Sequence, residues 1–273
     1  MSHFYISQYL IDQIKVISLE VADKINVIYQ QHKFGEHNVV LQNKKDHSHL
    51  TRADLVSHHI IQKALKKLTP HIPVVSEELT SSHGFISQPF YWLIDPLDGT
   101  KEFIHATDEF TINIALIQNG KAIFGLILAP ALHDMYWGSK LYGSFMSNHL
   151  GTKKISVTFP NQKEPIKLVS SRNHSNQDTL DFANTFSNKT FMGIGSSLKF
   201  CLIASGMAHV YPRLGRTCLW DTAAGQAILE NAGGHVYSLS GDSLTYNPLS
   251  IYNTNFIASS MPLKKLNQYK LQS

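Results

Sequence analysis

Apolar residues recur at helical spacing near the beginning of the chain. From Leu10 to Ile28 they stand three or four positions apart and are interrupted by charged residues such as Asp12 and Lys15. This pattern predicts an amphipathic helix that packs on a core. A similar pattern over residues 52–68 ends at Thr69-Pro70. It predicts a second helix, because proline stops helices.

Short apolar runs after the second helix predict strands, and the pair Asn119-Gly120 between two of them is a strong hairpin signal. The runs cover residues 74–75, 91–94, 111–117, 122–128, 135–138 and 155–158. We therefore expect the first half of the chain to combine helices with a largely antiparallel sheet.

The second half of the chain alternates strands and helices. The pattern predicts strands over residues 167–170 and 191–194 and helices over residues 177–186, 195–206 and 220–234. Such alternation favours an α/β arrangement with a mixed sheet. Residues 159–165 are the best candidate boundary. We expect an α+β lobe over residues 1–160 and an α/β lobe over residues 161–273, joined as one compact unit.

Composition and charge narrow the class of protein. Hydrophobic residues make up 43% and charged residues 16% of the chain, which is typical of globular proteins. The net charge of +4 is spread along the chain and argues against a nucleic-acid partner. We find no signal peptide and no membrane span, and the two cysteines predict no disulfide framework. We expect a soluble cytoplasmic protein and leave open a peripheral contact with the inner membrane.

Carboxylates gather in the stretch WLIDPLDGTKEF, residues 92–103. Asp95 and Asp98 follow an apolar run, where Pro96 fixes the backbone and Gly99 frees it. Two close carboxylates repel each other unless protons or cations lie between them, and oxygen ligands suit Mg²⁺. A strand-ending turn with solvated acids explains the same residues equally well.

Further acids admit both a functional and a structural interpretation. The pair Glu77-Glu78 stands at a predicted strand end, where a solvated loop is the ordinary explanation. Asp54 and Asp221 stand at predicted helix starts, where N-capping accounts for an aspartate. None of these acids indicates a function by itself.

Taken together and in this order, the segments resemble the inositol monophosphatase superfamily of metal-dependent, lithium-sensitive phosphomonoesterases. The resemblance rests on Thr51-x-x-Asp54, Glu77-Glu78, DPLDGT (95–100) and WDTAAGQAILENAGG (220–234), and it covers nearly the whole chain. It implies a layered αβαβα sandwich with the active site between the halves. Within the superfamily, DPLDGTKEF, EFTINIALI and GSSLKFCLIASG with YPR look most like the bacterial CysQ-type 3′(2′),5′-bisphosphate nucleotidases.

The resemblance implies two metal positions that share one carboxylate, with two or three Mg²⁺ ions in total. Glu77, Asp95 and the main-chain carbonyl of Leu97 match the ligands of the first metal. Asp95, Asp98 and Asp221 match those of the second. Asp95 would therefore bridge the two ions.

The resemblance also implies that Asp54 and Thr100 orient a metal-activated water, which attacks the phosphate without a phosphoenzyme. The amides of Gly99 and Thr100 and those at the helix start near Asp221 would point at the phosphate. One departure from relatives lies at residues 47–49, His-Ser-His, in a loop that often contains proline.

Specificity is expected to come from the second half of the chain. Gly195, Ser196, Ser197 and Lys199 begin a predicted helix and could meet a ribose and a second phosphate, with Arg213 as a partner for the 5′-phosphate. Capping of the helix by the serines and a surface position for Arg213 stay open as alternatives, and Lys101 could bind substrate or pair with an acid. The full set of expected substrate contacts is Glu77, Leu97, Asp98, Gly99, Thr100, Gly195, Ser196, Ser197, Lys199, Arg213 and Asp221.

The function implied by the resemblance is Mg²⁺-dependent removal of the 3′-phosphate from adenosine 3′,5′-bisphosphate, which links the chain to sulfur metabolism. The sulfated nucleotide would be a second substrate. An inositol-1-phosphate or fructose-1,6-bisphosphate phosphatase with the same metals is the nearest alternative. An alternative of another class is a non-catalytic nucleotide-binding regulatory protein, which the full set of acids argues against. The oligomeric state is left open.

Overall fold

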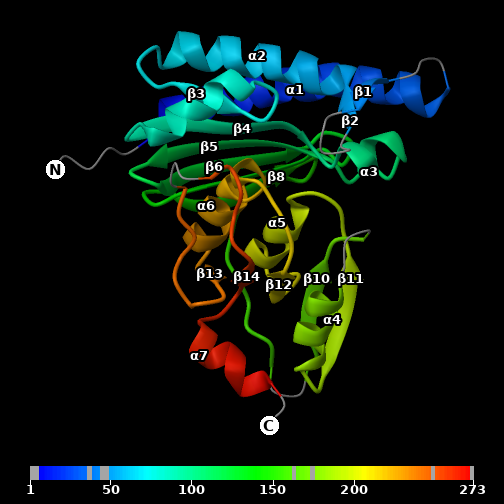
Figure 1. The fold of residues 1–273 in the computed structure, drawn as a ribbon, viewed down its shortest axis with the longest axis vertical. Coiled ribbons are helices and arrows are strands. Elements are labelled where there is room, and N and C mark those ends of the chain that lie inside the picture. Colours follow the sequence, from blue (N-terminus) through cyan, green and yellow to red (C-terminus); the bar gives the residue numbers. More distant parts are fainter. Residues whose placement is uncertain are drawn as a thin grey trace.

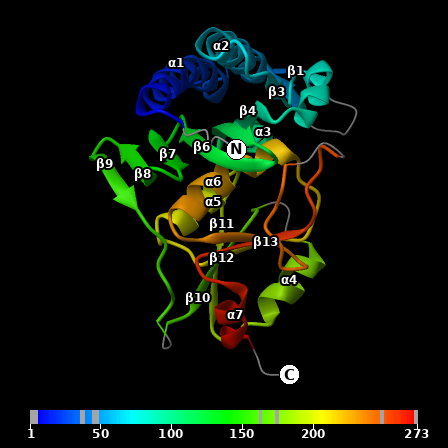
Figure 2. The same cartoon turned by 90° about the vertical axis from the view of Figure 1, so that its left-hand side faces the viewer.

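The computed structural model describes residues 6–35, 39–43, 49–161, 164–172, 176–246 and 250–270. These residues form alternating layers of helices and sheets (Figure 1, Figure 2). From one end to the other the layers are two helices, a large sheet, two central helices, a smaller sheet and two short outer helices. The αβαβα sandwich implied by the resemblance is confirmed.

The first layer consists of the two amphipathic helices predicted from the sequence. They are α1 (Gln8–Lys33) and α2 (Arg52–Leu68). Ser7 caps α1 by accepting a hydrogen bond from the backbone N–H of Leu10 at 3.2 Å. The apolar stripes of both helices pack on one face of the large sheet, in a cluster that includes Ile14, Ile61 and Trp92.

Within the described residues, the large sheet has seven strands in the order β3-β4-β5-β6-β7-β8-β9. β3 pairs with β4 in parallel and all other neighbours are antiparallel. The strands are β3 (Val74–Ser76), β4 (Phe90–Asp98), β5 (Thr111–Gln118), β6 (Lys121–Ala129), β7 (Asp134–Ser139), β8 (Gly143–Asn148) and β9 (Gly151–Ile155). The largely antiparallel sheet is therefore confirmed.

The predicted strand over residues 155–158 was wrong. β9 ends at Ile155, and Val157 leaves the sheet to donate its backbone N–H to the carbonyl of Ala232 at 3.0 Å. The sequence analysis also missed β8 and β9. From Gly151 to Lys154 the side chains of β9 are exposed, so this edge strand carries no apolar alternation that would reveal it.

The smaller sheet is mixed, as predicted, with the order β11-β10-β12-β14-β13. β10 runs parallel to β11 and β12, while β14 runs antiparallel to both of its neighbours. The strands are β10 (Ile166–Ser170), β11 (Lys189–Gly193), β12 (Val210–Arg213), β13 (His235–Ser238) and β14 (Phe256–Ser259). Helices α4 (Gln177–Asn184) and α7 (Leu263–Leu266) cover its outer face.

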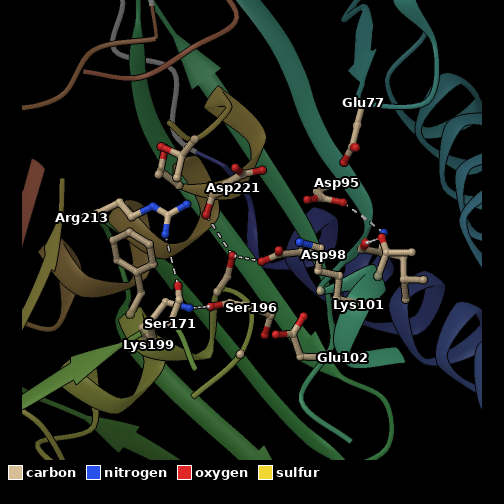
Figure 3. A pocket seen from close by; sticks show the side chains of 18 of the residues that line it. Glu77, Asp95, Asp98, Lys101, Glu102, Ser171, Ser196, Lys199, Arg213 and Asp221 are labelled. Atoms are coloured by element: carbon tan, nitrogen blue, oxygen red, sulfur yellow. Dashed lines mark hydrogen bonds between the residues drawn. The ribbon is translucent and has the colours of Figure 1, made fainter. Parts of the chain in front are cut away.

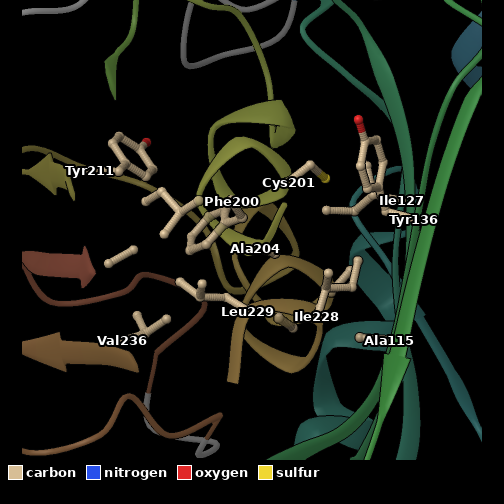
Figure 4. Packing of buried hydrophobic residues seen from close by; sticks show 14 of the residues in the cluster. Ala115, Ile127, Tyr136, Phe200, Cys201, Ala204, Tyr211, Ile228, Leu229 and Val236 are labelled. Carbon is tan, nitrogen blue, oxygen red and sulfur yellow. The ribbon is translucent and has the colours of Figure 1, made fainter. Parts of the chain in front are cut away.

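The central helices α5 (Leu198–Ala204) and α6 (Ala223–Asn231) join the two sheets through one core (Figure 4). Phe200 and Leu229 point toward the smaller sheet, and Ile228 points toward Ile127 of the large one. α6 lies very close to the large sheet. A Cβ at Gly125 of β6 would stand 2.2 Å from the carbonyl oxygen of Ala224.

Both central helices are shorter than predicted. α5 begins after Ser197 because Ser196 adopts a left-handed φ of 47°. The predicted helix over residues 220–234 divides at Thr222 into a 3-10 turn, η2 (Leu219–Asp221), and α6. The boundary between the lobes at residue 160 stays a prediction.

The remaining short elements are β1 (Val40–Asn43), β2 (His49–Thr51), η1 (Thr80–Ser87), α3 (Thr100–Ile104) and η3 (Asn267–Tyr269). β1 and β2 form a two-stranded sheet beside the start of α2, and β2 also packs against α3. In the part of the chain that the structure describes, no helix combines the length and apolarity needed to cross a membrane.

Candidate active site

A cavity of about 270 Å³ opens where β4 ends and α5 begins (Figure 3). Both carboxylates and cationic side chains line it. We call Glu77, Asp95, Asp98 and Asp221 the acidic wall, and Lys199 and Arg213 the cationic wall.

A β-bulge places two acids of the acidic wall. Asp95 pairs with Asn113 of β5 and Asp98 pairs with Thr111, so β4 has one residue more than β5 between these pairs. Side chains three apart on a regular strand point to opposite faces, and the extra residue of a bulge corrects this. The bulge is fastened locally, because the backbone N–H of Leu97 donates to Asp95 Oδ1 at 3.1 Å. The predicted turn after residue 94 is therefore a bulge inside β4.

The other two acids come from neighbouring elements. Glu77 directly follows β3, and its backbone N–H donates to the carbonyl of Ile94 on β4 at 3.3 Å. Asp221 ends η2, where its Oδ2 accepts a hydrogen bond from the backbone N–H of Cys218 at 2.8 Å. Asp221 thus caps the short turn before α6 and also faces the cavity.

Burial and like charge act together on the acidic wall. Burial raises the pKa of Asp95 well above its usual value, and the charges of Glu77, Asp98, Asp221 and Glu78 raise it further. Burial also raises the pKa of Asp221, with Asp98 and Glu77 adding to the effect. Such a group of carboxylates is stable near neutral pH only when protons or cations compensate the repulsion.

The donor chemistry of the acidic wall fits a hard divalent cation. Its ligand atoms are all oxygens, which Mg²⁺ prefers over nitrogen and sulfur. Among the described residues, no three acidic, histidine or cysteine side chains are arranged to hold one ion in their present positions. The acidic wall therefore fits Mg²⁺ for two reasons: it offers oxygen donors, and a bound cation would relieve the repulsion between its carboxylates.

The cationic wall is buried at its base. The ammonium of Lys199 donates to the carbonyl of Ile194 at 3.3 Å and to that of Ser196 at 2.5 Å, and it lies over the ring of Tyr211. Burial lowers the pKa of Lys199 to about 8, although the nearby Asp98 raises it. Two backbone carbonyls and the ring of Tyr211 therefore hold this ammonium at the base of the cavity.

Arg213 is held by two contacts at the end of β12. Its guanidinium donates to Ser171 Oγ at 3.3 Å and to the carbonyl of Arg216 at 3.0 Å. Its Nε is buried without a hydrogen-bond partner among the described residues. The alternative of a plain surface charge does not describe this half-buried side chain.

The segment between β11 and α5 connects the two walls. The backbone N–H of Gly195 donates to Glu109 Oε2 at 2.7 Å, and Glu109 also pairs with Arg172 at 2.5 Å. A Cβ at Gly195 would stand 2.6 Å from Glu102 Cγ, so only glycine fits here without a shift. Ser197 Oγ lies 2.5 Å from Asp98 Oδ2.

Asp54 and Thr100 occupy different surroundings. Thr51 and Asp54 form a capping box at the start of α2, in which Asp54 Oδ2 accepts from the backbone N–H of Thr51 at 2.7 Å and from its hydroxyl at 2.5 Å. Asp54 is 1% exposed and is absent from the described lining of the cavity. Thr100 begins α3 after the left-handed Gly99 and lines the cavity, with its hydroxyl 3.4 Å from the carbonyl of Leu97.

The cavity brings together most of the residues predicted from the sequence. Those that line it are Glu77, Asp95, Leu97, Asp98, Gly99, Thr100, Lys101, Gly195, Ser196, Ser197, Lys199, Arg213 and Asp221. His49 also lines it, while His47 and Ser48 lie outside the described residues.

Comparison with known proteins agrees with this geometry. The model of the inositol monophosphatase family matches residues 10–272. The chain belongs to the inositol monophosphatase family. The resemblance seen in the sequence is thereby confirmed, and enzymes of this family are metal-dependent.

Relatives of this family member are bacterial nucleotidases. The 3′(2′),5′-bisphosphate nucleotidase CysQ of Salmonella typhimurium is 39% identical over 241 residues, which cover 88% of this chain and 94% of that protein. CysQ of Escherichia coli strain K12 is 39% identical over 254 residues, which cover 92% and 99%. The CysQ-type branch named from the sequence is therefore confirmed.

Solved structures share the fold of this chain. CysQ from Bacteroides thetaiotaomicron superposes with a TM-score of 0.74 at 33% identity, covering 89% of this chain and 94% of that one. The extragenic suppressor protein suhB from Bartonella henselae reaches a TM-score of 0.77 at 20% identity, covering 96% and 98%, and supports the fold alone.

Sequence reasoning missed several residues around the cavity of this family member. Ser171 and Tyr211 line it, while Glu109 and Arg172 hold Gly195 from outside. Asn113 was also missed, although the sequence holds a signal for it. A polar side chain inside the apolar run 111–117 needs a buried hydrogen-bond partner.

Proposed function

We propose that the chain is a Mg²⁺-dependent 3′(2′),5′-bisphosphate nucleotidase, which converts adenosine 3′,5′-bisphosphate to AMP and phosphate by direct attack of water. The observation that carries the proposal is a single cavity that is lined by both the acidic wall and the cationic wall. The identity with CysQ proteins supports the same substrate class. The sulfated analogue of the nucleotide is a second substrate in this proposal.

The acidic wall would hold the metal. Glu77, Asp95, Asp98 and Asp221, with the carbonyl of Leu97, would be its ligands, because they line one cavity and offer only oxygen. Bound Mg²⁺ supplies a lowered pKa for water and positive charge for the phosphoryl oxygens. Two or three ions are proposed, with Asp95 shared between two of them.

The starts of α2 and α3 would handle the attacking water. Thr100 lines the cavity and can hold the water in line with the leaving 3′-oxygen. Asp54 would accept the water's proton. β2, which ends at Thr51, packs against α3, which begins at Thr100, and this packing supports the proposed pairing of Asp54 with Thr100. With water as the nucleophile, no serine or cysteine needs to form a phosphoenzyme.

The cationic wall would select the bisphosphate. Lys199 and Arg213 line the same cavity as the acids. They would bind the second phosphate while the first one faces the acids. The unpartnered Nε of Arg213, counted over the described residues, supports a ligand oxygen at this position. Ser196 and Lys101 line the rim and are proposed as further substrate contacts.

The test is phosphate release with Mg²⁺, compared among adenosine 3′,5′-bisphosphate, inositol 1-phosphate and fructose 1,6-bisphosphate, each with and without Li⁺. We expect a strong preference for the nucleotide and suppression by Li⁺. A preference for either sugar phosphate would keep the acidic wall and overturn the role given to Lys199 and Arg213. Binding of the nucleotide without any turnover would instead support a regulatory protein.

A further inference from the structure

Ser197 occupies the N-cap position of α5, but its hydroxyl does not cap that helix within the described residues. A serine at an N-cap ordinarily accepts a hydrogen bond from a backbone N–H in the first turn. Ser197 is 2% exposed and turns its hydroxyl into the junction between the two sheets. The hydroxyl must therefore be explained by its contacts there.

Three groups surround the Ser197 hydroxyl. Asp98 Oδ2 lies 2.5 Å away, the carbonyl oxygen of Asp221 lies 2.9 Å away, and Asn113 Nδ2 donates to the hydroxyl at 2.8 Å. A hydroxyl has one proton to give. The shorter distance and the negative charge make Asp98 the stronger acceptor. Ser197 thus ties a carboxylate of β4 to the backbone of η2.

Asn113 fixes this arrangement from β5. The hydroxyl of Thr111 donates to Asn113 Oδ1 at 3.0 Å, which sets the orientation of the amide and leaves Nδ2 to face Ser197. Asn113 Nδ2 also lies 3.4 Å from Asp98 Oδ2. Thr111 and Asn113 are both buried. Ser197 and Asn113 therefore both contact the same oxygen of Asp98, Oδ2.

We propose that Ser197 is a positioning residue: its hydroxyl, held by Asn113, fixes Asp98 against Asp221 and so prepares the acidic wall for a divalent cation. The inference rests on the proposed function, since it assigns a partner to two proposed metal ligands. It also joins the acidic wall to the segment that carries Lys199. Hydrogen-bond partners of metal ligands typically change metal affinity by roughly 10–100-fold when they are removed.

The test is the affinity of the full chain for Mn²⁺, a spectroscopic stand-in for Mg²⁺, measured by electron paramagnetic resonance without substrate. Ser197→Ala should weaken Mn²⁺ binding at least about tenfold. The matched control is Ser205→Ala at the other end of α5, where the hydroxyl donates to the carbonyl of Cys201 at 2.8 Å. The control loses a hydrogen bond of the same helix and should bind Mn²⁺ within about twofold of the unchanged chain.

A second variant protects the test against a folding defect. Asn113→Ala should weaken Mn²⁺ binding in the same direction, and the double variant should be no weaker than Ser197→Ala alone, because both changes break one network. Additive losses, or Mn²⁺ binding by Ser197→Ala equal to that of Ser205→Ala, would overturn the proposal.

The outcome separates this inference from the proposed function. If Ser197→Ala weakens Mn²⁺ binding but the unchanged chain releases no phosphate from any of the three substrates, the positioning role of Ser197 stands and the proposed nucleotidase activity is wrong. If the unchanged chain releases phosphate but Ser197→Ala binds Mn²⁺ as tightly as the unchanged chain does, the nucleotidase activity stands and the positioning role of Ser197 is wrong.

Discussion

The two walls of the cavity are built in opposite ways. In the acidic wall, Asp95 and Asp98 stand on β4, where the bulge sets them on the same side, and Glu77 directly follows the neighbouring strand β3. Asp221 is added from η2. The cationic wall comes from two separate elements, α5 and the end of β12, and is held by backbone carbonyls and a serine. The acidic wall is thus built mostly at one edge of the large sheet, and the cationic wall is built where a central helix meets the smaller sheet.

This difference separates chemistry from selectivity. A rigid sheet holds mutually repelling carboxylates in place, as a metal-dependent reaction requires. The cationic side chains come from other elements, so they can be substituted without disturbing the metal ligands. This arrangement suits residues that select among phosphorylated substrates. The two walls should therefore respond differently to substitution, and the predictions below test that separation.

The largest effect is expected from Asp95→Asn. Loss of the shared carboxylate should lower kcat for the nucleotide by roughly a thousandfold or more, because the amide removes the charge that holds the metal. The melting temperature in EDTA should not fall, since burial and like charge already disfavour the carboxylate and raise its pKa. Phosphate release and thermal melting measure the two effects.

Asp134→Asn is the control for this change. Asp134 belongs to the same sheet but lies outside the described lining of the cavity, where it accepts a hydrogen bond from Asn148 at 3.2 Å. The kcat of Asp134→Asn should stay within about twofold of that of the unchanged chain. Normal turnover by Asp95→Asn would remove the metal assignment of the acidic wall.

The next largest effect is expected from Arg213→Met. Its kcat/KM for adenosine 3′,5′-bisphosphate should fall about 10–100-fold, because hydrogen bonds to a charged group contribute roughly 1.5–3 kcal/mol. For adenosine 3′-phosphate, which lacks the second phosphate, the change should stay within about threefold. Steady-state kinetics with both nucleotides measure the split.

Arg216→Met is the matched control for Arg213→Met. Arg216 lies three residues further along and contacts the ring of Tyr252 outside the described lining of the cavity. It should leave both substrates unaffected. Equal losses on the two nucleotides with Arg213→Met would contradict a role in reading the second phosphate.

In EDTA, the two walls should make the free energy of unfolding depend on pH in opposite directions. Asp95 and Asp221 have raised pKa values in the folded chain, so the folded state binds more protons than the unfolded state above about pH 3.8. Their contribution to stability is therefore lost as pH rises through the raised values.

Lys199 acts at higher pH. With its pKa lowered to about 8, it is charged in the unfolded state and neutral in the folded state from about pH 8 to 10.5. Stability should rise with pH in that range.

Thermal melting in EDTA across both pH ranges checks these signs. Relative to the unchanged chain, Asp95→Asn should flatten the fall above pH 4 and Lys199→Met should flatten the rise above pH 8. Saturating Mg²⁺ should flatten the acidic branch in the unchanged chain, because a cation replaces the protons. An acidic branch that Mg²⁺ leaves untouched would argue that the carboxylates do not share a cation.

The sequence predicted the acidic wall better than the cationic wall for a physical reason. Asp95 and Asp98 stand within one strand, so the sequence already gives their spacing, and only the bulge between them had to be added. Helices α1 and α2 were predictable in the same way, since their apolar stripes are local. Local patterns thus predicted α1, α2 and most of the large sheet, but not β8 and β9.

Contacts between distant segments were not predictable from local patterns. Ser197 could be expected to cap α5, and only the approach of β4 shows that its hydroxyl faces Asp98. Glu109 and Arg172 are far apart in the sequence and meet only because the two sheets share a central layer. The environment of Lys199 follows from the same packing.

The smallest effect is expected from Glu109→Gln, which tests whether the segment before α5 tunes the cationic wall. The amide oxygen can still accept from Gly195, but the ion pair with the half-exposed Arg172 is lost, and such pairs are worth about 1 kcal/mol or less. We expect KM for the bisphosphate to rise two- to fivefold, roughly, with kcat unchanged. The exposed Glu164 supplies the control, Glu164→Gln. A fall in kcat instead would mean that the same segment also sets the acidic wall, through Ser197, and the two walls would then be one mechanical unit.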